Sequence, residues 1–226
     1  MKEAERFVFL VRDTEVQVEQ METLRRLKDR IRGFKYGARK AQDEGAANVL
    51  FHLQCGLNAM SSFLAMWVEL KKPDYYSAWS RLIDSEEYIS VAMRASDAGA
   101  ALEAFLRRLK ETERVIFPGF RVYNSAGLLI RGNCSVCGKP FSGCQHLEGR
   151  VYWGRLCRRV NVDLVSVDHV AIVDEPRDRR CVMTEITDDG FYRDFMTWKK
   201  LRKLEEGAPN NKVTGIVFSF EQIETD

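Results

Sequence analysis

The chain has 226 residues, of which 45% are hydrophobic and 30% are charged. This composition excludes a mainly disordered chain, a collagen-like fibre and a coiled-coil rod, and the length is sufficient for one large domain or two smaller ones. Lys and Arg together number 35, against 33 Asp and Glu, so the net charge of +2 indicates no particular partner.

Long helices are expected in the first half of the chain, because residues 1–117 contain a single proline, Pro73. Apolar residues that recur every three to five positions predict amphipathic helices there. The expected bounds are about 13–43, 46–70 and 74–95, followed by a helix that starts at Ser96 as its N-cap and ends before Phe117. Four helices with short connections predict an antiparallel bundle.

The longest apolar stretch, residues 46–70, has to be compared with a membrane span. It carries seven polar residues: Asn48, His52, Gln54, Asn58, Ser61, Ser62 and Glu69. A bilayer rarely tolerates so many polar groups, so the stretch is predicted to be a buried bundle helix with no membrane role. The apolar run Phe7–Val11 is too short for the core of a signal peptide, and a cytoplasmic location is expected.

After Pro118 the sequence becomes rich in β-branched residues, which favours strands. Residues 120–123 and 128–131 flank Asn124–Gly127 and predict a hairpin. Further strands are expected at 151–152, 160–167, 169–173, 181–186 and 213–220, with one helix over 191–206. The chain is therefore predicted to be α+β, with a helical bundle domain over 1–117 and a small α+β domain over 118–226.

Four of the six cysteines lie within residues 134–157, next to a histidine. Cys134 and Cys137 are separated by two residues and followed by Gly138, which permits a tight turn that directs two thiolates at one ion. Cys144 and His146 follow within ten residues. Three sulfurs and one imidazole form a donor set that suits tetrahedral Zn²⁺, so we predict one zinc ion per chain that stabilises the second domain.

Cys157 lies eleven residues beyond His146 and is an alternative ligand that could replace Cys144 or His146. A closed shell of four protein ligands leaves no position for water, so the site is predicted to be structural rather than catalytic. A thioredoxin-like redox pair is disfavoured, because Gly138 and Pro140 interrupt the helix that such a pair would need. Buried free thiols are the remaining interpretation.

Basic residues cluster around the predicted zinc segment. Residues 121–159 contain seven basic residues and one acid, Glu148, for a charge of +6, whereas residues 160–198 carry −5. Arginine interleaved with aromatic residues can hold phosphates and stack on bases, and it can equally bind an acidic protein. We therefore define a basic-aromatic strip as the candidate partner-binding surface: Arg150, Tyr152, Trp153, Arg155, Arg158 and Arg159. The alternative is that this strip pairs with the acidic residues 160–198 of the same chain.

A second basic stretch, residues 25–40, holds eight positive residues and one acid, Asp29. Acidic residues precede it, and acid first with base last is the order that the helix dipole favours. A solvated helix face is therefore expected, with contact to phosphate or to a partner as the alternative.

Evidence for catalysis is sparse. The sequence contains none of the common nucleotide-binding, zinc-protease or nucleophile-elbow motifs. His52 with Cys55 could form a nucleophile pair, but a core histidine is the preferred interpretation. His169 with Asp168, Asp174 or Glu175 could support a metal-assisted hydrolase or nuclease, although Asp168 and His169 should lie on opposite faces of a strand. A role without catalysis is therefore favoured, with the hydrolase or nuclease as the alternative.

The sequence thus predicts a zinc-binding recognition or adaptor protein that presents the basic-aromatic strip to a macromolecule. A protein partner is favoured over nucleic acid, because the total charge is balanced. Self-association through the helical bundle is a further hypothesis, with Trp67, Tyr75, Tyr76 and Trp79 at or near the contact.

Overall fold

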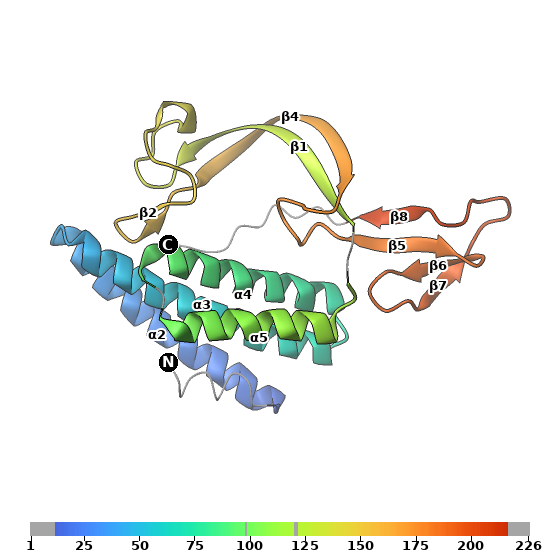
Figure 1. Ribbon diagram of the computed structural model, residues 1–226, viewed down its shortest axis with the longest axis horizontal. Coiled ribbons are helices and arrows are strands. Elements are labelled where there is room, and N and C mark those ends of the chain that lie inside the picture. Colours follow the sequence, from blue (N-terminus) through green and yellow to red (C-terminus); the bar gives the residue numbers. More distant parts are fainter. Residues whose placement is uncertain (1–11, 98, 120–121, 217–226) are drawn as a thin grey trace. The chain divides into compact units, whose positions relative to one another are not determined.

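The computed structural model describes residues 12–97, 99–119 and 122–216 (Figure 1). The run Phe7–Val11 and Arg121 therefore lie outside the described residues. Contacts divide the described chain into two compact units. The first contains the residues up to Glu113 together with Ile130–Asp163, and the second contains Arg114–Leu129 and the residues from Leu164 onward. The zinc segment thus groups with the helices, while the division into domains 1–117 and 118–226 stays a prediction about independent folding.

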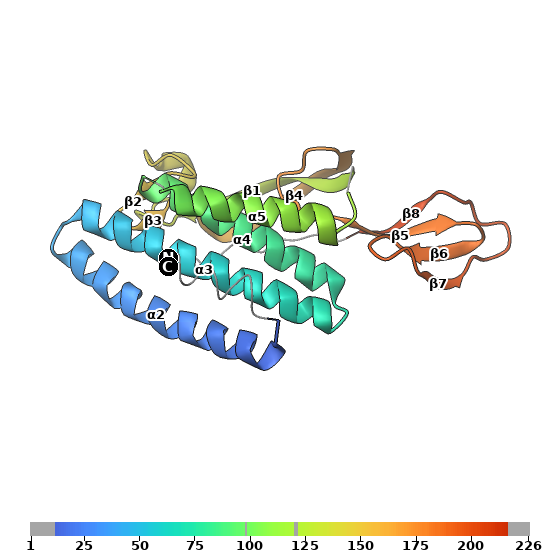
Figure 2. The same cartoon turned by 60° about the horizontal axis from the view of Figure 1, so that its bottom comes forward.

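Four helices form the larger part of the first unit and run side by side (Figures 1 and 2). They are α2 (Thr14–Lys40), α3 (Glu44–Lys71), α4 (Tyr75–Ala95) and α5 (Ala100–Ile116). Aspartates cap the first three: Asp13, Asp43 and Asp74 each accept a hydrogen bond from the backbone N–H three residues later. The predicted helical half and the α+β class are confirmed. Ser96 caps the C-terminus of α4, so its predicted role as the N-cap of α5 is wrong.

Helix α3 is the centre of the bundle, because it packs on both α2 and α4. Phe51 and Phe63 of α3 and Trp79 of α4 are almost completely buried, and Phe63 makes an edge-to-face contact with Phe105 of α5 at 5.9 Å between ring centroids. Among the described helices, α3 alone is long and apolar enough to cross a membrane, but 56% of its most apolar window is buried inside the structure. The buried core helix of a folded domain meets the same criteria of length and composition. The burial of α3 agrees with the prediction that residues 46–70 form a buried bundle helix.

The zinc segment is built from short elements between two long strands. Strand β1 (Tyr123–Cys134) leads into the 3-10 turn η1 (Phe141–Gly143), the hairpin of β2 (Val151–Tyr152) and β3 (Arg155–Leu156), and strand β4 (Arg159–Val173). Strands β1 and β4 pair with each other as a two-stranded ribbon (Figure 1). The predicted hairpin around Asn124–Gly127 is wrong, because those residues continue one strand whose partner lies about 40 residues away in sequence.

A four-stranded antiparallel sheet with the order β7-β6-β5-β8 forms most of the second unit. Its strands are β5 (Met183–Asp188), β6 (Phe191–Asp194), β7 (Lys200–Lys203) and β8 (Val213–Ile216). The predicted helix over 191–206 is wrong. Gly190 turns the chain with a φ of +72°, and Tyr192 then pairs with Arg202, whose guanidinium lies 3.7 Å from the Tyr192 ring centroid.

Candidate metal centre

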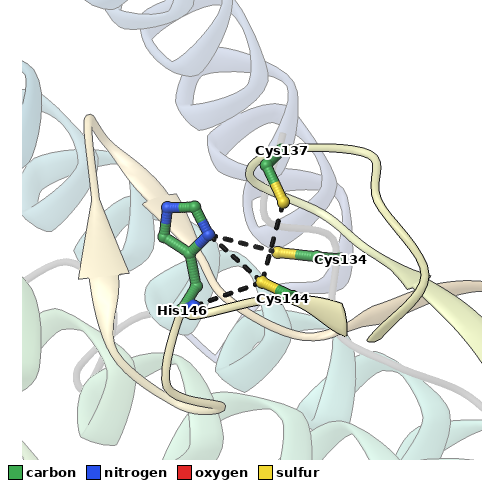
Figure 3. A group of neighbouring side chains, drawn as sticks. All are labelled: Cys134, Cys137, Cys144 and His146. Atoms are coloured by element: carbon green, nitrogen blue, oxygen red, sulfur yellow. Dashed lines mark hydrogen bonds between the residues drawn. The ribbon is translucent and has the colours of Figure 1, made fainter. Parts of the chain in front are cut away.

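Four potential metal ligands converge at the end of β1 (Figure 3). Cys134 is the last residue of β1, Cys137 follows in the next turn, and Cys144 and His146 come directly after η1. One ligand atom from each residue lies within 4.8 Å of the others, and no other such group of three or more His, Cys, Asp or Glu residues occurs in the described part of the chain. The structure therefore gathers the first of the two ligand sets that the sequence predicted.

The distances between these atoms fit a tetrahedral ion. Zn–S bonds of about 2.3 Å and a Zn–N bond of about 2.0 Å require about 3.8 Å between two sulfurs and about 3.5 Å between sulfur and nitrogen. The sulfurs of Cys137 and Cys144 are 3.6 Å apart, and Nδ1 of His146 lies 3.8 Å from Cys134 Sγ and 3.2 Å from Cys144 Sγ. The donor set and its spacing therefore fit zinc.

The backbone around the first two cysteines explains why they point inward. Gly138 adopts a φ of +72° and donates its N–H to the carbonyl of Cys134 at 2.8 Å, which closes the turn. Burial alone would raise the pKa of Cys134, but N–H groups of Cys137 and Val136 outweigh it and lower this pKa to about 6. The turn thus favours the thiolate, which is the form that binds metal.

The second pair of ligands is supported by Tyr152 of β2. The His146 N–H donates to Cys144 Sγ at 3.2 Å, and the His146 ring lies edge-on to the Tyr152 ring with centroids 4.7 Å apart. The Tyr152 hydroxyl accepts the N–H of Leu147 at 3.2 Å. Tyr152 therefore helps to orient His146, one of the four candidate ligands. The sequence had placed Tyr152 only in the partner-binding strip, because a spacing of six residues from His146 does not indicate such a contact.

Cys157, the alternative ligand, is a neighbour of Cys134 but does not belong to the group of four. Its Sγ is 3.8 Å from Cys134 Sγ, and its side chain is completely buried. Burial and the neighbouring Cys134 raise the pKa of Cys157 to about 12. Because its sulfur lies outside the group of four, Cys157 is best described as packing beside the first ligand.

The β2–β3 hairpin fixes the metal segment to the helices. Its two turn residues, Trp153 and Gly154, both have positive φ, at 52° and 68°. The Trp153 N–H donates to Glu44 Oε1 at 3.1 Å, and the Gly154 N–H donates to Asn48 Oδ1 at 2.8 Å. A Cβ on Gly154 would lie 2.7 Å from the carbonyl oxygen of Ala47, so only glycine fits this contact with the first turns of α3.

Members of the basic-aromatic strip differ in how far they reach solvent. Arg150 and Trp153 are exposed, whereas Arg155, Arg158 and Arg159 are half-buried. Arg159 also has local partners, because its guanidinium lies 4.8 Å from the Phe141 ring centroid and 3.9 Å from Glu148. Arg150, Trp153 and Arg155 are consequently the members best suited to contact another molecule.

Several carboxylates of the acidic segment 160–198 have basic partners from their own half of the chain. Glu185 pairs with Arg202 at 2.8 Å, Asp188 with Arg193 at 2.7 Å, and Asp178 with Arg180 at 2.9 Å. These three carboxylates already have partners and are therefore less available to form ion pairs with the basic-aromatic strip.

The residues of the alternative hydrolase site do not assemble into a metal group. His169 Nδ1 lies 3.0 Å from Asp168 Oδ2, so these two side chains contact each other although they are neighbours in a strand. Both side chains are exposed, and Asp174 accepts the N–H of Glu175 within a separate turn. His52, the other histidine considered, bonds the carbonyl of Ala92 at 2.9 Å while burial raises the pKa of Cys55 to about 12, as expected for a core pair.

The fold and the site together define an α+β protein with a helical bundle and a Cys3His group that can hold a metal ion. None of three comparisons, with protein-family models, with curated proteins and with solved structures, found a match.

Proposed function

We propose that this chain is a zinc-binding recognition protein. In this proposal one structural Zn²⁺ per chain, held by Cys134, Cys137, Cys144 and His146, folds a loop that presents the basic-aromatic strip to a macromolecular partner. The observation that carries the proposal is the convergence of four metal-binding atoms within 4.8 Å, in a segment whose hairpin is fixed to α3. Four protein ligands complete the usual zinc shell, which supports a structural role.

The second basic stretch supports a larger positive surface. The aliphatic part of Lys35 on α2 lies against Gly154, so the end of α2 and the hairpin turn are neighbours. Tyr36 is 58% exposed there, and the Lys40 ammonium lies 4.8 Å from its ring centroid. An acidic surface of a protein partner fits this arrangement best, since the whole chain is nearly neutral and lacks the net excess of most nucleic-acid-binding domains.

Reversing two charges of the strip tests this function. We expect Arg150→Glu combined with Arg155→Glu to weaken partner binding about 10-fold or more, because two surface contacts worth about 1 kcal/mol each are lost and replaced by repulsion. Arg131→Glu combined with Lys139→Glu is the matched control, since it changes the charge equally at exposed positions of the same segment.

The measurement is titration of each zinc-loaded variant against the molecule that co-purifies with the unaltered protein. Equal loss of affinity in both double variants would show that the strip has no specific role. A steep decrease in affinity with salt would indicate nucleic acid instead of protein. Zinc content and helical circular dichroism confirm that each variant is folded.

A further inference from the structure

Strand β4 exposes an unusual number of large apolar side chains. Six of them, between 43% and 66% exposed, are Val162, Leu164, Val165, Val167, Val170 and Ile172. Leu129 of the paired strand β1 is also 58% exposed. Isolated exposed apolar residues are ordinary on a protein surface, but a contiguous run along one strand marks an interaction site.

The hydrogen-bonding edge of β4 is as unusual as its side chains. Within the described residues, β4 pairs with β1 on one side and with no strand on the other. An isolated two-stranded ribbon is only marginally stable in water. Free edges are normally protected by charged residues, proline or a bulge. The sequence from Val162 to Val173 contains only two acidic residues, Asp163 and Asp168, and no Lys, Arg, Pro or Gly. This edge therefore has the properties of a strand that receives a partner.

We propose that β4 pairs with β4 of a second copy of this chain. The two strands run antiparallel about a two-fold axis, and the ribbons join into one four-stranded sheet with β1 strands at its outer edges. Backbone hydrogen bonds of the free edges supply the affinity, and the apolar side chains of both copies pack beside one another on the joined sheet.

The positions of the charged residues favour a second copy over another occupant. In a symmetric antiparallel pair, residues equally distant from the central residue lie opposite each other on the same face. With Ser166 at the centre, Asp163 lies opposite His169 of the second copy, and the same pair forms again on the other side of the axis. Val162 then lies opposite Val170 of the second copy.

Other symmetric registers lack this complementarity. Centring the pair on Asp168 places two carboxylates opposite each other, which is unfavourable. Centring it on Val165 or on Val167 places Asp163 opposite Val167 or Ala171, where it has no polar partner. The Ser166 register also sets one carboxylate, Asp168, opposite an apolar residue, Leu164, but Asp168 has a partner within its own chain. In the Ser166 register, Asp168 keeps its 3.0 Å contact with Nδ1 of His169 in its own chain, and Nε2 of that ring is the atom that Asp163 of the second copy would contact.

Self-association of the full zinc-loaded chain, measured by sedimentation velocity over a concentration series, tests the proposal. We expect a reversible dimer for the unaltered protein and at least a 10-fold weaker dimer for Val165→Lys, which places a charge on the paired edge. Val115→Lys on α5 is the matched control, since Val115 is 76% exposed and belongs to a helix rather than to the β1–β4 ribbon. The control is expected to dimerise like the unaltered protein.

A charge exchange separates pairing from damage to the fold. Asp163→Lys and His169→Glu are each expected to weaken the dimer, whereas the two changes in one chain place opposite charges across the axis and recover most of the affinity. A misfolded ribbon would not be rescued in this way. The proposal is overturned if the unaltered protein is monomeric at every concentration, if Val165→Lys dimerises normally, or if the double variant is no better than the single ones. A normal Val165→Lys dimer would point to another surface, such as the helical bundle.

Discussion

Loss of a single metal ligand is expected to unfold the zinc segment while the helices remain. In Cys137→Ser, affinity for Zn²⁺ should fall by more than about 100-fold, because disturbing an outer-shell partner alone costs about 10–100-fold. The segment has few buried apolar side chains of its own: Cys134, Leu156 and Cys157 are buried, whereas Leu147 is 55% exposed. Its order thus depends on the metal, whose binding free energy in comparable peptides is about 10–16 kcal/mol at neutral pH.

Zinc content by native mass spectrometry and the rate of proteolysis within residues 134–158 are the measurements. The unaltered protein should carry one zinc and resist cleavage, and chelation should reproduce the behaviour of Cys137→Ser. Cys157→Ser is the matched control, since Cys157 adjoins the site without belonging to the group of four. This variant is expected to retain the metal. Zinc retained by Cys137→Ser, or lost from Cys157→Ser, would contradict the assignment of the four ligands.

Local patterns predicted the elements that depend on neighbours in sequence. Helices α2, α3 and α4 begin next to aspartates that cap them, and their apolar spacing is a property of one helix at a time. The metal ligands were found for the same reason, because Cys134, Cys137, Cys144 and His146 lie within thirteen residues and a short loop has few ways to arrange them.

Features that depend on distant pairing were missed. Residues 124–127 resemble a turn, yet they continue strand β1, because β4 provides a partner strand that lies far away in sequence. The apolar spacing of residues 191–206 suits a helix, but the contacts of Tyr192 with Arg202 and of Glu185 with Arg202 stabilise a sheet instead. Sequence distance also concealed the attachment of Gly154 to Asn48, 106 positions earlier.

This attachment changes how the metal site relates to the rest of the fold. The sequence placed the zinc segment in a domain separate from the bundle, whereas its hairpin contacts α3 directly, and Arg94 of α4 also donates to the carbonyl of Gly149 at 3.0 Å. The metal ion would therefore order a loop that already contacts α3 through the β2–β3 hairpin and α4 through Gly149. Recognition by the strip then depends on two supports, the metal and the hairpin contact, which can be removed separately.

Removing the second support is expected to destabilise the first unit substantially. Gly154→Ala adds a Cβ 2.7 Å from the carbonyl oxygen of Ala47 and forces an L-residue to keep a φ of +68°. The left-handed conformation costs about 1–2 kcal/mol, and displacement of the turn loses the bonds to Glu44 and Asn48, each worth about 1 kcal/mol.

We therefore expect Gly154→Ala to lower the free energy of unfolding by about 3–4 kcal/mol, measured by urea denaturation of the zinc-loaded protein. Gly149→Ala is the matched control, because Gly149 has a φ of +81° in the same segment and its nearest neighbour is the flexible end of Arg94. That variant should lose only about 1–2 kcal/mol, the cost of the backbone conformation. Equal losses in the two variants would show that the close contact with α3 contributes nothing, whereas a larger loss at Gly154 with zinc still bound would establish the hairpin as a support independent of the metal.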